Sequence, residues 1–372
     1  MRMLPLALAA VALLPPASLF AQTDQGKIAF RATDRSNPGG RAAYTIRPDG
    51  SNRTRLPTGP RDLFVSWSPD GTRVALAAAT EDDEALLMEH ALDFHFMIHL
   101  MDADGSDRRR LTDTPGQLFQ WSADGTRLVF TSGFEDERNR NTECCKSIAV
   151  YVIDADGTGL TRVTEVGSSN AFPSWSPDGT RVAFSSDREW ERGPQGMRVS
   201  GTWQIYVANA DGSGESRLLD HPEDDISPVW SPDGTRIVFT TSALPGAPNA
   251  MRPSVMVVNT DGSGLQELAE GLNAGRPVWS PTGDSMLVTG HDEDIFLVDL
   301  ATGSVRNLTE SPGREVEAVF SPDGSRVAFT SNRGGTQDIY LVNVDGSGLI
   351  RLTNDEMHEN ELEWVRDPGQ RE

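Results

Sequence analysis

The sequence Trp175-Ser-Pro-Asp-Gly-Thr-Arg-Val-Ala-Phe184 decides the fold, because close copies of it recur along the chain. The spacing between neighbouring copies runs from 41 residues (279 to 320) to 55 residues (175 to 230). Periods of this length are typical of propeller blades or of helical arrays, and the local residues distinguish the two. The other copies begin at Trp67, Trp121, Trp230, Trp279 and Phe320.

Each copy leads into short apolar runs that predict strands. Runs such as Ile237-Val-Phe239 are β-branched or aromatic, are bounded by turn residues and are too short for helices. A later run, for example Ile339-Tyr-Leu-Val342, leads to Asp345-Gly346, and Asp-Gly between strands predicts a hairpin because glycine accepts a positive φ. A final Arg-Leu-Thr, as at 351–353, adds a fourth strand. Each unit is therefore predicted to be a four-stranded antiparallel blade of an all-β propeller.

This blade pattern resembles the TolB-type propeller repeat, and the resemblance covers nearly all of residues 27–366. The shared residues lie at turn and core positions, so the resemblance implies the fold but leaves the activity open. TolB itself has six blades and an α/β domain before its propeller, and we expect neither feature in this chain.

Two incomplete units at the ends of the repeat region predict how the ring closes. Ile28–Phe30, Tyr44–Ile46 and Thr54–Leu56 supply three strands without an opening strand, whereas Glu361–Trp364 supplies an opening strand with nothing after it. We expect the N- and C-terminal strands to pair, which leaves few free strand edges. Counting this composite unit gives seven blades. The tryptophans of the repeat are expected to form inter-blade core, since their position relative to the turn is constant.

The first residues have the pattern of a secretory signal. Met1-Arg-Met3 is followed by an apolar run to Leu14 and by small residues that end at Ala21. We therefore predict a signal peptide at 1–21, a single propeller domain at 22–372, and a periplasmic or secreted protein. No later stretch approaches the ~20 apolar residues of a transmembrane helix, so no membrane span is expected.

The charge balance limits the classes of partner. With 33 basic and 55 acidic side chains, the formal net charge is -22, which opposes binding to the phosphates of nucleic acid. A basic protein surface, a cation or a neutral glycan remains compatible. Cys144 and Cys145 are adjacent, so they are either incidental thiols or a strained vicinal disulfide, and not a disulfide framework.

One face of the ring is predicted to carry the binding site. The Asp-Gly turns of one face, here called the turn face, are nearly uniform, whereas the loops of the other face differ in every unit. We call this second face the variable face, and divergent loops on a rigid scaffold are where binding residues concentrate. Its longest loops are 77–96, 131–148, 185–203 and 240–254, the first of which is predicted to hold a capped helix near 80–92.

Polar residues near the tunnel mouth on the variable face are the candidate binding residues. Clustered carboxylates could bind a divalent cation or a basic peptide segment, or they could form a solvated rim. No other cofactor is expected. The candidates are Asp224, Asp225, Arg276, Glu315, Glu317, His358, Glu359 and Glu361.

The function predicted from these features is binding rather than catalysis. A peptidase of the prolyl-oligopeptidase type would need a hydrolase domain and a Gly-x-Ser-x-Gly elbow, neither of which is found. The alternative is a metal-dependent propeller enzyme such as a polysaccharide lyase or another glycan-active protein, with His221, His291 and His358 as metal-ligand candidates. We favour a monomeric scaffold that binds a protein partner, with the cell envelope as its setting.

Overall fold

The computed structural model describes residues 26–34, 40–59, 62–78, 96–133, 147–189, 191–192, 198–242, 254–268, 272, 277–290 and 293–366. Within these ranges, no helix is both long enough and apolar enough to cross a membrane. Some predictions fall outside the described residues. They are the signal peptide at 1–21, the helix near 80–92, Cys144 with Cys145, Arg276 and His291.

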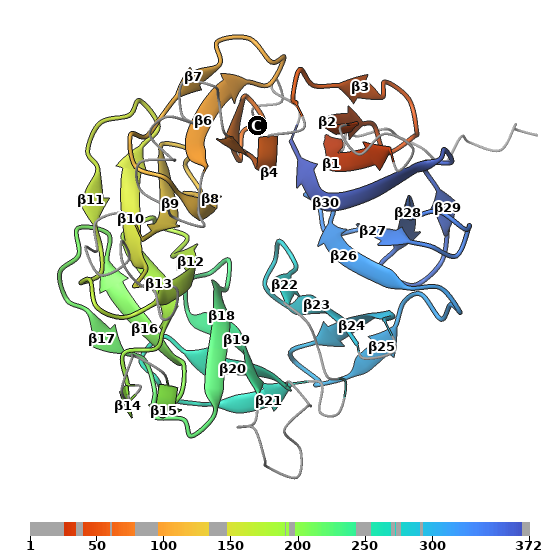
Figure 1. The fold of residues 1–372 in the computed structure, drawn as a ribbon. Coiled ribbons are helices and arrows are strands. Elements are labelled where there is room, and N and C mark those ends of the chain that lie inside the picture. Colours follow the sequence, from red (N-terminus) through yellow and green to blue (C-terminus); the bar gives the residue numbers. More distant parts are fainter. Residues whose placement is uncertain are drawn as a thin grey trace, which may run out of the picture.

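Seven four-stranded antiparallel sheets form a ring around a central opening (Figure 1), which confirms the predicted seven-bladed propeller. Blade 1 contains β4 (Asp62–Trp67), β5 (Arg73–Ala78), β6 (Met97–Asp102) and β7 (Arg109–Arg110). Blade 2 contains β8 (Gln117–Trp121), β9 (Arg127–Ser132), β10 (Ala149–Asp154) and β11 (Thr161–Arg162). Blade 3 contains β12 (Asn170–Trp175), β13 (Arg181–Ser186), β16 (Gln204–Asn209) and β17 (Ser216–Arg217).

The later blades follow the same order. Blade 4 contains β18 (Asp224–Trp230), β19 (Arg236–Ser242), β20 (Ser254–Asn259) and β21 (Gln266–Leu268). Blade 5 contains β22 (Val278–Trp279), β23 (Ser285–Thr289), β24 (Ile295–Asp299) and β25 (Val305–Asn307). Blade 6 contains β26 (Glu315–Phe320), β27 (Arg326–Ser331), β28 (Asp338–Asn343) and β29 (Ile350–Arg351). The predicted long loop 185–203 of blade 3 holds a separate two-stranded sheet of β14 (Glu191–Arg192) and β15 (Arg198–Ser200).

Blade 7 closes the ring with strands from both ends of the chain. It contains β30 (Met357–Val365), β1 (Lys27–Asp34), β2 (Arg41–Ile46) and β3 (Thr54–Arg55), in that order from the centre outward. Ile28 is paired with Trp364 and Ala29 with Glu363 in antiparallel register. The predicted closure by pairing of the terminal strands is therefore confirmed.

The core lies between blades, and the repeated aromatic residues fill it. One cluster joins Ile98 and Leu100 of blade 1 to Trp121, Phe130 and Tyr151 of blade 2. Five of the repeated tryptophans and Phe320 are at most 9% exposed, which confirms their assignment to the inter-blade core. They are Trp67, Trp121, Trp175, Trp230 and Trp279.

The arginine of each Gly-Thr-Arg or Gly-Ser-Arg turn also joins neighbouring blades. The Arg127 guanidinium of blade 2 lies 4.9 Å from the ring centroid of Trp175 in blade 3, and its Nη2 donates to the Gly179 carbonyl at 2.7 Å. In return, Trp175 Nε1 donates to the Gln120 carbonyl at 3.3 Å. Such a desolvated cation–π contact contributes about 1–2 kcal/mol. The same stack joins Arg73 to Trp121, Arg181 to Trp230, Arg236 to Trp279 and Arg326 to Trp364.

The turn that carries this arginine is held by its own side chains. Ser176 Oγ donates to Asp178 Oδ1 at 2.5 Å, and the Thr180 backbone N–H donates to the same oxygen at 3.0 Å. The hydrogen bond from Ser176 is the main reason that the pKa of Asp178 is lowered to about 2. Gly179 has a φ of 66°, which a residue with a Cβ rarely adopts. The turn therefore places Arg181 beside the next blade, and the turn arginines of blades 1, 2, 4 and 6 occupy the same position.

Deleting residues 359–372 should destabilise the ring strongly. The deletion removes most of β30 and with it the pairing to β1 and the burial of Leu362 and Val365. We expect the melting temperature to fall by roughly 10 °C or more. Deletion of 367–372 alone, which leaves β30 intact, is the control. Equal melting curves for the two truncations, followed by circular dichroism, would contradict the closure.

The stack between Arg127 and Trp175 can be measured with a double-mutant cycle. Trp175→Ala should lower the free energy of unfolding by about 3–5 kcal/mol, because it leaves a cavity between blades. Combination with Arg127→Ala should show a coupling energy of about 0.5–2 kcal/mol in urea titrations. Arg162→Ala, at a surface ion pair with Glu165, should cost below about 1 kcal/mol. Additive losses at Arg127 and Trp175 would show that the stack does not stabilise the ring.

Candidate functional site

A β-bulge interrupts the innermost strand of most blades at one repeated position. The ladder register shifts between Gln117 and Gln120 in blade 2 and between Val316 and Val319 in blade 6. The residue three before the repeated aromatic has a positive φ in blades 2, 3, 4, 6 and 7. We call these residues the bulge ring: Leu118 (50°), Phe172 (53°), Ser227 (58°), Glu317 (55°) and Glu361 (56°).

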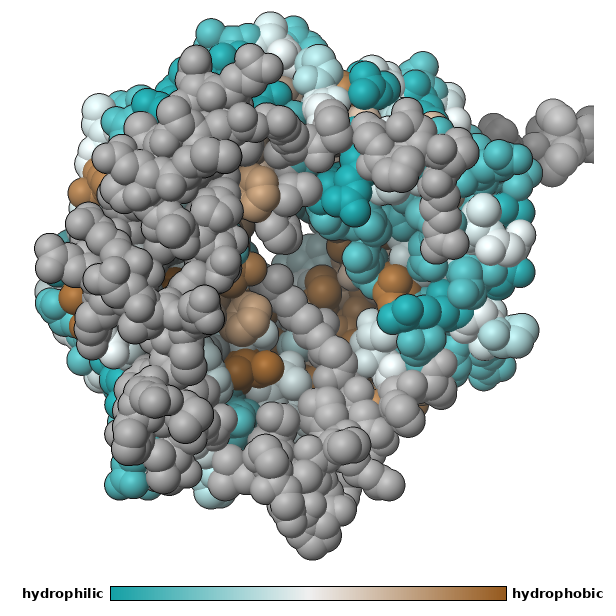
Figure 2. Space-filling model, in the orientation of Figure 1, coloured by the Kyte–Doolittle hydropathy of each residue, from teal (hydrophilic) through white to brown (hydrophobic). Residues whose placement is uncertain are grey.

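The bulge ring is conformationally costly, and it determines what faces the tunnel. A non-glycine residue in the left-handed region costs about 1–3 kcal/mol and persists only where the surrounding structure imposes it. Bulges also redirect side chains away from the alternating pattern of a strand. In five blades, one residue is therefore redirected on an innermost strand, and these strands surround the central opening (Figure 1). Figure 2 shows the hollow at the centre of the ring, with hydrophobic side chains on part of its wall.

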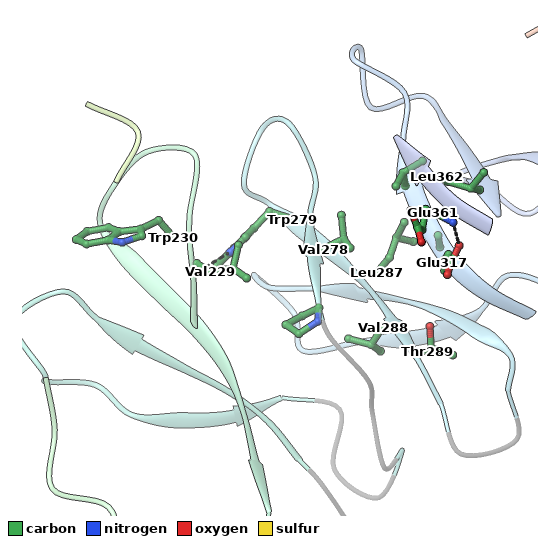
Figure 3. A pocket seen from close by; sticks show the side chains of 13 residues that line it. Val229, Trp230, Val278, Trp279, Leu287, Val288, Thr289, Glu317, Glu361 and Leu362 are labelled. Atoms are coloured by element: carbon green, nitrogen blue, oxygen red, sulfur yellow. Dashed lines mark hydrogen bonds between the residues drawn. The ribbon is translucent and has the colours of Figure 1, made fainter. Parts of the chain in front are cut away.

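A cavity of about 630 Å³ opens beside the bulge ring, between the innermost strands of blades 4 to 7. Its wall is mainly apolar and includes Val229, Val278 and Leu287 (Figure 3). Of the described residues that line it, only Glu317 and Glu361 carry charge. The structure therefore places two of the predicted site residues together in a largely apolar cavity.

The two carboxylates in the cavity differ in their partners. Arg31, whose side chain is 8% exposed, donates from Nη1 to Glu361 Oε1 at 2.6 Å. Glu317 accepts the backbone N–H of Glu361 on Oε2 (Figure 3). Burial raises the pKa of Glu317, the Glu361 N–H opposes this shift, and the Glu361 charge adds to it. With both carboxylates ionised, this group of three side chains carries one net negative charge.

A third glutamate on β30 faces blade 1. Glu363 Oε2 accepts the backbone N–H of Trp67 at 2.8 Å, which joins the closing strand to the next blade. Burial raises the pKa of Glu363 to about 7. The strand that closes the ring therefore carries a glutamate at three alternate positions, Glu359, Glu361 and Glu363.

Three predicted rim residues are buried rather than solvated. Asp225, Glu315 and Glu359 are 0% exposed, and each lies five residues before the repeated aromatic. Their backbone N–H groups donate to carbonyl oxygens in the variable-face loop of the preceding blade. The acceptors are Trp203, Glu293 and Gln337. The structure therefore does not show a solvated acidic rim at these three positions, because β18, β26 and β30 each begin below the variable-face loops.

The buried carboxylates have local partners. Glu315 accepts from Ser331 Oγ at 2.8 Å and lies 3.1 Å from Arg333 Nη2. Glu359 lies 3.5 Å from Arg53 Nη2. Burial raises the pKa of Glu359 to about 8, with the Asp355 charge adding to this shift and Arg53 opposing it. Through these contacts, Glu315 and Glu359 hold the N-terminal ends of β26 and β30 in place.

The histidine candidates do not converge in the described part of the chain. His221 Nδ1 lies 2.8 Å from Asp225 Oδ1, and this hydrogen bond raises the pKa of His221. His358 lies on β30 opposite Thr33, three blades away from His221. Among the described residues, no group of three or more His, Cys, Asp or Glu side chains is arranged to hold a metal ion.

Asp224 completes the predicted set, and its role is local. Its Oδ1 accepts the backbone N–H of Trp203, which lies in the 185–203 loop of blade 3, at 2.7 Å. The structure thus divides the described candidates among three blades: Asp224 and Asp225 in blade 4, Glu315 and Glu317 in blade 6, His358, Glu359 and Glu361 in blade 7.

Sequence reasoning missed several residues of the site. Leu118, Phe172 and Ser227 share a constant offset of three residues before the repeated tryptophan, and that offset was the available signal. Arg31 carried no such signal, because its contact with Glu361 joins residues 330 positions apart and depends on ring closure.

Comparisons with known proteins agree with the repeat pattern. Residues 249–369 match the TolB beta propeller domain. The chain is 31% identical over 175 residues to a protein TolB homolog of Chlorobium luteolum, covering 46% of this chain and 36% of that one. It is 34% identical over 155 residues to the Tol-Pal system protein TolB of Bordetella pertussis, covering 40% and 34% respectively. The matches thus span about a third of the length of these curated relatives.

Solved structures show the same fold. TolB from Acinetobacter baumannii aligns with a TM-score of 0.52 and 18% identity, covering 92% of this chain and 67% of that one. An oligogalacturonate lyase in complex with manganese aligns with a TM-score of 0.61 and 16% identity, covering 82% of each chain. At these identities the likeness concerns the fold alone, and the manganese belongs to the lyase.

The blades, the inter-blade core and the lined tunnel together define a β-propeller protein. Within that class, the match of residues 249–369 to the TolB beta propeller domain and the similarity to the two TolB relatives support a TolB-like propeller family.

Ionisation of Glu359 should make stability depend on pH. Its pKa is about 8 in the folded chain and ordinarily 4.5, so the folded protein binds more protons between these values. The free energy of unfolding should therefore fall as the pH rises from 4.5 to 8, and this contribution should be constant outside that window. Glu359→Gln should flatten the dependence in urea titrations at pH 5, 7 and 9. Equal slopes for Glu359→Gln and for the exposed-site control Glu356→Gln would contradict the assignment.

Proposed function

We propose that this protein is an exported scaffold that binds a protein partner at the cell envelope through the variable-face end of its tunnel. The observation that carries the proposal is the cavity of about 630 Å³ beside the bulge ring, with its apolar wall and two carboxylates. Pockets for ligands commonly have about 300–1,000 Å³, a mainly apolar lining and a few placed polar groups.

The ring supports this function by being rigid before the partner arrives. Inter-blade clusters and arginine stacks hold each blade against the next, so little ordering is needed when a partner segment enters. Preorganisation reduces the entropic cost of binding, and burial of apolar area contributes roughly 25 cal/mol per Å². A partner segment that covers the apolar wall would therefore bind without a large rearrangement.

The relatives support the envelope setting. Two of the matching proteins bear the name TolB, and one of them is named as part of the Tol-Pal system. The predicted signal peptide at 1–21 agrees with such a location. Export, the envelope partner and a monomeric state are parts of the proposal that rest on these similarities and on the N-terminal sequence.

Narrowing the tunnel should abolish partner capture. Ser227→Trp places a large ring in the bulge ring, and Phe172 shows that this backbone geometry accommodates an aromatic residue. In pull-downs from the envelope fraction of the source organism, we expect the captured partner to fall at least tenfold. The matched control is Asp211→Asn, which keeps the acceptor oxygen of an exposed turn on the turn face.

The melting temperature of each variant is measured before capture. Equal capture by Ser227→Trp and the unchanged protein would contradict binding at the tunnel. A loss found only with Asp211→Asn would place the site on the turn face instead.

A further inference from the structure

The bulge ring has two halves of different chemistry. Blades 2 and 3 contribute Leu118 and Phe172, whereas blades 6 and 7 contribute Glu317 and Glu361. Phe172 is 37% exposed, so its ring is accessible to a partner. The innermost strands β8 and β12 lie across the opening from β26 and β30 (Figure 1). An apolar half therefore faces an acidic half across the tunnel.

The acidic half has one charge that the neighbouring described residues leave unbalanced. Arg31 forms its ion pair with Glu361, while Glu317 accepts backbone N–H groups of β30. Backbone donors orient the Glu317 carboxylate without neutralising it. Glu317 is exposed to solvent, and apolar side chains such as Val278 and Leu362 line the same cavity.

Charge complementarity selects the occupant of this site. An ionised carboxylate beside an apolar wall favours a cation with several N–H donors, and the wall favours a carbon chain behind that cation. A lysine or arginine side chain combines both features, because its charged end follows a long apolar stem. The net charge of -22 would also attract basic segments toward the ring.

We propose that the tunnel accepts a basic side chain of the partner protein, flanked in the partner sequence by an apolar residue. Glu317 and Glu361 hold the cation, and Phe172 with Leu118 contacts the apolar neighbour. This inference rests on the proposed scaffold function, since it specifies the segment that the partner inserts. The bulge ring then acts as the specificity-determining element, because its backbone is shared by the blades while its side chains differ.

The test uses the full chain and synthetic peptides. Fluorescein-labelled Gly-Leu-Arg-Leu-Gly is compared by anisotropy with peptides that carry citrulline or lysine in place of the arginine. Citrulline keeps the shape of arginine but lacks its charge. We expect the arginine and lysine peptides to bind at least tenfold more tightly than the citrulline peptide. Equal affinities for arginine and citrulline would overturn the proposal.

Variants of the chain locate the bound peptide. Glu317→Gln keeps an acceptor for the Glu361 N–H and should abolish the preference for arginine, whereas the exposed-site control Glu165→Gln should preserve it. Phe172→Ser, which copies the residue found at this position in blade 4, should weaken the leucine-flanked peptide at least threefold but leave Gly-Gly-Arg-Gly-Gly unchanged. An arginine preference that survives Glu317→Gln would place the peptide elsewhere on the acidic surface and overturn the proposal.

Failure of this inference is distinct from failure of the scaffold function. If Ser227→Trp abolishes partner capture while the peptides show no charge preference, the scaffold function stands and the basic side chain is wrong. If partner capture is unaffected by Ser227→Trp, the tunnel is not the binding site and both proposals fail.

Discussion

The rest of the structure depends on the stacking of an arginine from one blade on a tryptophan of the next. A four-stranded blade exposes two apolar faces and is stable only when neighbours cover both. The Arg127 guanidinium stacks on Trp175 of the next blade, and its Nη2 donates a hydrogen bond to the Gly179 carbonyl of that blade. The same contact recurs at the interfaces between blades 1 and 2, 2 and 3, 3 and 4, 4 and 5, and 6 and 7.

Closure of the ring also determines which side chains line one side of the tunnel. β30 is both the closing strand and a source of acidic side chains, and its Glu361 meets Arg31 only because β1 pairs beside it. The raised pKa values of Glu359 and Glu363 reflect the low solvation of this strand. Stability and recognition are therefore coupled in blade 7, since the residues that close the ring also shape one side of the cavity.

The turn face and the tunnel differ in how uniform their residues are from blade to blade. On the turn face, serine, aspartate and glycine form nearly identical turns that position the arginine stacks. Around the tunnel, the same backbone bulge carries leucine, phenylalanine, serine or glutamate. The repeated residues therefore determine the geometry of the blades, whereas the side chains at the bulge positions differ from blade to blade.

The sequence by itself determined the blade architecture, the number of blades and the tryptophan core. These features depend on contacts within a repeat or on a constant offset from the turn, so local patterns reveal them. Only the tertiary structure decided that Asp225, Glu315 and Glu359 are buried and that Glu317 and Glu361 share a cavity. Burial of a polar side chain depends on which loop covers it and on which distant strand lies beside it. A local sequence pattern contains no information about such long-range neighbours.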